Sequence, residues 1–243
     1  MPDVYIGHFL LIFKIVVMLK NVSLLILIIC SFFSNVKGQG YLKDASGAPM
    51  PIGKYVEVDG DQFLDPEWRK GTVAFANGGA IKDIDLKLDV VDSKLIFQSK
   101  KGEALYFVDQ VKEFTLVFPG SLNNTKEVVK HFKNGYTAPD NSSTETFYQV
   151  LYSGTVELLK RTSKSVMEQR RYDSSVTNKS FQENTRYYLV ISGKVTPVKN
   201  DKKSFLNLLK DKEAALETYI KSNKTNFKSD ADLVSLITYY NSI

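Results

Sequence analysis

The chain has 243 residues, a formal net charge of +5 at neutral pH and a single cysteine, Cys30. Beyond Gly38 it has no cysteine and one histidine, His131, so disulfides, thiolate chemistry and a zinc site with several His or Cys ligands are excluded there. Basic residues are spread along the chain instead of gathering with aromatic residues in one patch, which argues against nucleic-acid binding.

Residues 1–38 are far more apolar than the rest of the chain. We predict that they form a removable signal peptide whose true start is Met18, with a short basic region, an apolar core and small residues before the cleavage point. If Met1 is the start, a retained membrane anchor is the alternative. Lipidation at Cys30 is a third hypothesis, although the bulky Ile29 before the cysteine is unlike a lipidation motif.

Residues 39–64 are rich in Gly and Pro and are predicted to form an extended lead-in. The stretch from Gly47 to Lys54 is not a phosphate-binding loop, because no Gly-Lys-Ser/Thr sequence follows the glycines. Asp65-Pro66-Glu67-Trp68 is typical of a helix start, since Asp can cap free backbone N–H groups and Pro suits the first helical position. We expect one helical turn there.

Residues 65–200 are predicted to be an antiparallel β-rich region. The clearest pattern is Ile81–Val91, where apolar residues alternate with polar ones, as in a strand with one buried face. Asn77-Gly78 before it favours a tight hairpin turn. Five successive strands with short turns predict a β-meander. These strands are Thr72–Ala76, Ile81–Val91, Lys94–Gln98, Ala104–Val108 and Lys112–Phe118.

Two polar stretches interrupt the later strands. We expect residues 119–146 to be a long connection with a short helix at Lys126–Phe132, and residues 163–183 to be a mobile loop. Two more hairpins are predicted around them, Phe147–Tyr152 with Thr155–Lys160 and Tyr187–Ile191 with Lys194–Val198.

Residues 201–243 change to the apolar spacing of helices. A break is expected near Asp211, and Ser229 is predicted to cap a last helix with Asp232 three residues later. Strands followed by helices predict an α+β fold: an antiparallel, meander- and hairpin-rich sheet with two C-terminal helices packed on or beside it as one domain.

The chain is rich in aromatic residues, and four of them are candidate ligand-binding residues: Trp68, Tyr148, Tyr187 and Tyr188. Neighbours in a strand point to opposite faces, so one of Tyr187 and Tyr188 is expected to be exposed or to lie under another element. Packing in the core is the competing interpretation. The aspartates Asp83, Asp85 and Asp89 are interpreted as the polar side of a strand, and no catalytic residue, metal ligand or cofactor is predicted.

Several runs of aromatic and turn residues resemble a known group of proteins. These runs are Asp65–Val73, Asp109–Phe114, Phe147–Gly154 and Tyr239–Asn241. Together they are similar to uncharacterised exported proteins of Gram-negative bacteria, over most of the chain beyond Gly38. The resemblance implies a location in the cell envelope, but it implies no activity.

We therefore expect an exported protein that is periplasmic, associated with the outer membrane or extracellular. Its function is expected to be non-enzymatic binding of an envelope protein, a lipid or a glycan, through the sheet or the two polar stretches. It is not expected to bind nucleic acid or to span the membrane once the signal is removed. The alternatives are a hydrolase such as a glycosidase, with Asp65, Glu67 and Glu113 as the first carboxylates to test, and a membrane-anchored or outer-membrane-associated structural protein.

Overall fold

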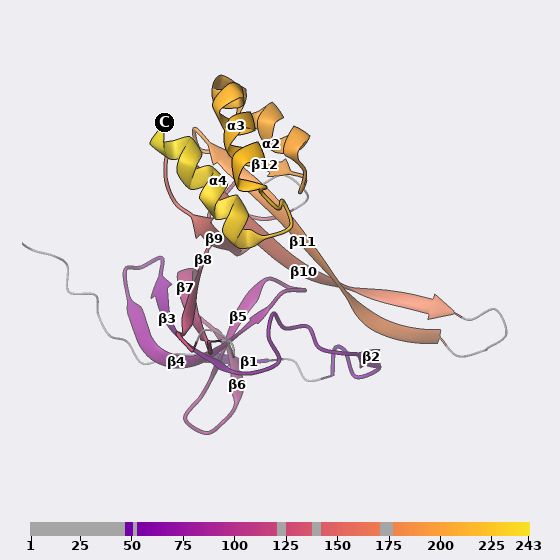
Figure 1. Cartoon of the computed structure of the whole chain (residues 1–243). Helices are drawn as coiled ribbons and strands as arrows, with labels where there is room; N and C mark the ends of the chain where they lie inside the picture. The colour runs from indigo at the N-terminus through magenta and orange to yellow at the C-terminus, as the bar shows by residue number, and fades with distance from the viewer. Residues whose placement is uncertain (1–46, 51–52, 121–124, 138–141, 171–176) are drawn as a thin grey trace, which may run out of the picture. The chain divides into compact units, whose positions relative to one another are not determined.

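A computed structural model describes residues 47–50, 53–120, 125–137, 142–170 and 177–243. The predicted signal peptide and Cys30 lie outside these ranges. All of the described residues belong to one unit, Tyr41–Ile243. They form a sheet of twelve strands followed by three α-helices, which confirms the α+β class (Figure 1).

The first seven strands are β1 (Gly47–Pro49), β2 (Val58–Asp59), β3 (Arg69–Phe75), β4 (Ala80–Asp89), β5 (Lys94–Gln98), β6 (Ala104–Phe107) and β7 (Val111–Phe118). They confirm the predicted run of strands, but not a simple meander. The order in the sheet is β1-β6-β5-β4-β3-β7, so β7 pairs with β3 and not with β6.

This order requires the sheet to curl. Four strand spacings separate β6 from β7 along the sheet, about 19 Å if it were flat. Only residues 108–110 connect the two strands, and a connection of that length reaches about 14 Å. The curl encloses an aromatic core, in which the Phe114 ring stacks on Phe132 at 4.8 Å and meets Phe147 edge-on at 5.0 Å.

The sheet continues from β7 through five more strands in chain order: β8 (Val128–Lys133), β9 (Tyr148–Tyr152), β10 (Val156–Arg170), β11 (Thr177–Ile191) and β12 (Lys194–Val198). Two predictions are wrong here. The helix expected at Lys126–Phe132 is strand β8, which pairs with β7 over six residues. The mobile loop expected at 163–183 is largely the outer part of the β10–β11 hairpin.

The helices are α2 (Lys202–Leu208), α3 (Glu213–Asn223) and α4 (Asp230–Ser242), with a 3₁₀ turn η1 (Lys210–Lys212) between the first two. The described residues thus hold three helices where two were predicted. The expected break near Asp211 is confirmed, because η1 separates α2 from α3. The predicted cap is also confirmed, since the Ser229 hydroxyl accepts a hydrogen bond from the Asp232 N–H at 3.3 Å.

The helices cover one face of the sheet at β10–β12. There, Leu158, Tyr187 and Leu189 pack against Phe205, Leu236 and other helical side chains in a second core. Asn241 fixes α4 to β10, because its side chain accepts from the Val156 N–H and donates to the Val156 carbonyl. Leu159 and Tyr188 belong to a third core on the opposite face, where Tyr136 packs beside Tyr148.

Two local predictions near β3 and β4 are wrong. Asp65-Pro66-Glu67-Trp68 is a series of bends without a helical turn, and the Asp65 carboxylate accepts from the Glu67 N–H and pairs with Arg69 at 3.0 Å. Asp89, expected on the polar face of its strand, is 1 % exposed. The reason is that Gln62 and Leu64 hydrogen-bond to the backbone beside it and cover the end of β4.

Candidate functional site

The candidate site is the outer part of the β10–β11 hairpin, called here the arm, which extends beyond the folded cores. It consists of Arg161–Arg170 and Thr177–Arg186, paired in continuous register from Arg161↔Arg186 to Arg170↔Thr177. In Figure 1 these parts of β10 and β11 run on beyond the helices as a two-stranded ribbon. Backbone pairing holds the arm together, since its side chains contribute no member to any of the three cores.

One partly buried lysine fixes the base of the arm. The Lys164 side chain is 16 % exposed, and its Nζ donates to the carbonyl oxygens of Phe63 at 2.6 Å and Asp61 at 3.0 Å. The Lys164 backbone N–H also donates to the carbonyl of Val90 at 3.3 Å. These contacts tie the arm to the curled first half of the sheet.

The arm has two faces, because side chains directly opposite each other in a ladder point the same way. The inner face shares the side of Lys164. On it, Val166 lies opposite Phe181, and the Phe181 ring meets Tyr55 edge-on at 5.2 Å. Glu168 and Lys179 form an ion pair at 3.3 Å. Since β2 pairs with β11 at Lys179 and Ser180, the segment around β2 lies against this part of the arm.

The outer face carries no acidic residue. Its members are Arg161, Ser163, Ser165, Met167 and Gln169 on β10, opposite Arg186, Asn184, Gln182, Ser180 and Asn178 on β11. Apart from the two arginines, all but one of these side chains are neutral amides and hydroxyls. The exception is Met167, a thioether that is 36 % exposed. The outer face is thus polar, with positive charge at its base.

Both edges of the arm also offer backbone groups. Because the Lys164 N–H points away from β11, alternation turns the backbone groups of Val166 and Glu168 the same way. No described strand pairs with β10 beyond Lys160 on that side. On the other edge, β12 reaches only to Tyr187, so residues 181–186 have no described strand beside them. Unpaired edges are templates for another strand.

The four predicted ligand-binding aromatics do not form one surface. Tyr148 and Tyr188 are completely buried, with their ring centroids 5.3 Å apart. Tyr187 lies on the opposite face under α4, where its hydroxyl donates to Asp230 at 2.6 Å. Burial and then Asp230 raise the pKa of the Tyr187 phenol. Trp68 is separate and partly exposed, with the Lys87 ammonium 5.0 Å from its ring.

Of the three candidate carboxylates, Glu113 is not brought beside Asp65, and Glu67, two residues after Asp65, is exposed. Asp65 pairs with Arg69 at the start of β3, whereas Glu113 lies beside Ala74 near its end. Five residues of strand separate these positions, about 17 Å. Glycosidase carboxylates lie about 5–10 Å apart. Glu113 instead faces His131 at 3.6 Å, where both side chains are partly open to solvent.

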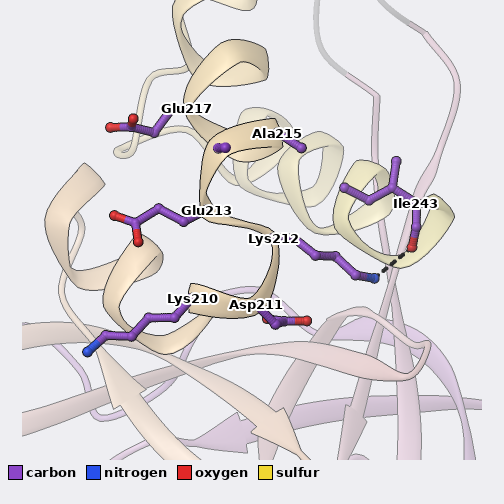
Figure 2. Close-up of a pocket in the computed structure, with 8 residues that line it drawn as sticks. Lys210, Asp211, Lys212, Glu213, Ala215, Glu217 and Ile243 are labelled. Carbon is purple, nitrogen blue, oxygen red and sulfur yellow. Dashed lines mark hydrogen bonds between the residues drawn. The ribbon is translucent and has the colours of Figure 1, made fainter.

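The cavities among the described residues are shallow and open. One of about 690 Å³ lies beside the start of α3. Figure 2 shows that Lys212 reaches from it toward the carbonyl oxygen of Ile243, whereas Glu213 and Glu217 point away to the other side. Its side chains therefore do not converge on a common point. Within the described ranges, no three His, Cys, Asp or Glu side chains are grouped as metal ligands would be.

Comparisons with known proteins add no relative: no family model matches the chain, and neither curated proteins nor solved structures give a significant match. In the part of the chain that the structure describes, no helix is long and apolar enough to cross a membrane.

Sequence reasoning missed the arm as a structural element, although a signal was present. Thr162 and Val166 are residue types that favour strands, but no alternation of apolar and polar residues accompanies them.

Proposed function

We propose that this chain is a partner-binding protein that uses the arm as its contact surface. One observation carries the proposal: strands of fifteen residues extend well beyond the cores that stabilise their inner ends. Ordering such a ribbon costs conformational entropy without a core to offset it. A long two-stranded ribbon with open edges also favours pairing with other chains. Binding a partner accounts for both features.

A protein partner fits better than a small ligand. Ligand sites are concave and bury most of the ligand, whereas the arm is a ribbon open on its outer face. Met167 and Val166 offer apolar contacts on its two faces, at 36 % and 37 % exposure. The resemblance to exported bacterial proteins supports a partner in the cell envelope, and the export signal of the N-terminus remains part of this proposal.

The test is site-specific photocrosslinking in the cells that naturally produce the protein. A benzophenone amino acid replaces Ser165 or Gln182, which are exposed and opposite each other on the arm. The matched control carries it at Lys221, an exposed position on α3. We expect a discrete adduct of one partner from both arm positions and none from the control. If the arm positions give no adduct, or the same adducts as Lys221, the proposal is wrong.

A further inference from the structure

We propose that the partner presents an acidic protein segment to the outer face of the arm, with Arg161 as the principal contact. This inference rests on the proposed function and specifies the chemistry of the partner. It follows from the charges of the arm, from the geometry of its base and from the side chains that the outer face lacks.

The arm is basic as a whole. Residues 161–170 and 177–186 contain five basic and two acidic side chains, and both acids lie on the inner face. There Glu168 pairs with Lys179, and Glu183 lies opposite Lys164. The outer face is therefore left with positive charge alone, which attracts an acidic surface and orients its approach.

The base of the outer face places two arginines side by side. Arg161 and Arg186 are direct cross-strand partners, so their Cβ atoms lie about 5 Å apart. A guanidinium can bind an incoming carboxylate through two parallel hydrogen bonds. Arg186 already takes part in another contact within the chain. For Arg161, no carboxylate within ion-pair distance is found among the described residues.

Two alternatives fit the outer face less well. A second copy of this chain would bring one basic arm against another, and like charges oppose that pairing. An acidic glycan would offer sugar rings that stack on aromatic side chains, and none of the ten outer-face residues is aromatic. A polypeptide matches the available groups, because its amides pair with Ser, Asn and Gln, and an apolar residue can cover Met167.

The test measures binding of fluorescein-labelled poly-L-glutamate to the full chain by fluorescence anisotropy. Arg161→Glu is compared with Lys221→Glu, which makes the same change in net charge on α3. Losing a bidentate guanidinium–carboxylate contact is expected to weaken binding by about 10-fold or more, and the control by less than about 2-fold. Arg161→Lys keeps the charge but not the paired donors, and we expect an intermediate loss.

Equal weakening by Arg161→Glu and Lys221→Glu, or no binding of poly-L-glutamate to the unmodified chain, overturns the inference. Tighter binding of polygalacturonate than of poly-L-glutamate, lost in Arg161→Glu, also overturns it and assigns the face to an acidic glycan. These results leave the proposed function standing if the crosslinks from Ser165 and Gln182 are found. Absence of those crosslinks defeats the proposed function itself, whatever the polymer shows.

Discussion

Replacing Lys164 with Met tests whether the base of the arm is held as the structure indicates. The substitution keeps most of the aliphatic chain and removes the ammonium group, which donates to the carbonyl oxygens of Asp61 and Phe63. Hydrogen bonds from a charged donor contribute about 1.5–3 kcal/mol each, and water can reach part of this site. We therefore expect the free energy of unfolding to fall by about 2–4 kcal/mol.

The matched control is Lys179→Met, in which the lost partner is the exposed carboxylate of Glu168. A surface pair of this kind contributes less than about 1 kcal/mol. Urea denaturation followed by circular dichroism measures both variants, and the midpoint for Lys164→Met is expected to fall by about 1–2 M. If the two variants lose the same stability within about 0.5 kcal/mol, Lys164 does not anchor the arm, and this reasoning is refuted.

Three further predictions concern the rest of the fold. Gly71→Ala places a Cβ 2.0 Å from the backbone oxygen of Thr115, so we expect circular dichroism to show that this variant does not fold. The control Gly102→Ala, at φ +82° in open space, is expected to lower stability by only about 1 kcal/mol, and a folded Gly71→Ala protein would contradict the packing of β3 on β7. Burial raises the pKa of the Asp89 carboxyl in the folded protein, so its stabilising contribution is complete below the unfolded-state pKa of about 4 and is lost as pH rises through the folded-state pKa. The stability of the unmodified protein, measured upward from pH 4, should therefore fall relative to that of Asp89→Asn. Parallel pH profiles of the two proteins would show that burial does not perturb this group. Ser229→Ala removes the cap of α4 and should lower stability by about 1 kcal/mol, whereas Ser235→Ala within the same helix should change it by less than about 0.5 kcal/mol; equal effects in thermal unfolding would argue against the cap.

The strands with one buried face could be predicted from the sequence. Between Ile84 and Leu88, apolar and polar residues alternate because β4 has a core on one side, and Asn77-Gly78 supplies the turn before it. The partner of β7 could not be predicted. Its pairing with β3 depends on how far the whole sheet curls, and no local pattern records that distance.

The errors have two physical origins. Val128, Val129 and Phe132 have a spacing that also suits a helix, and only pairing with β7 and β9 makes the segment a strand. The arm has no buried face for most of its length, so its strands lack the apolar alternation by which strands are recognised. The candidate site was missed for the same reason, because the side chains of the arm belong to none of the three cores and therefore leave no apolar pattern in the sequence.

The central claim, that the arm binds a partner, is tested most directly by the migration of the protein in native gel electrophoresis after gentle extraction from the cells that produce it. The comparison variant replaces residues 165–182 with Asn-Gly, which joins the paired residues Lys164 and Glu183 by a tight turn and keeps the three cores. Our account predicts that the intact chain migrates in a complex with a partner and the trimmed, still folded chain as a monomer. Migration of both chains as monomers, or of both in a complex with the same partner, would contradict it.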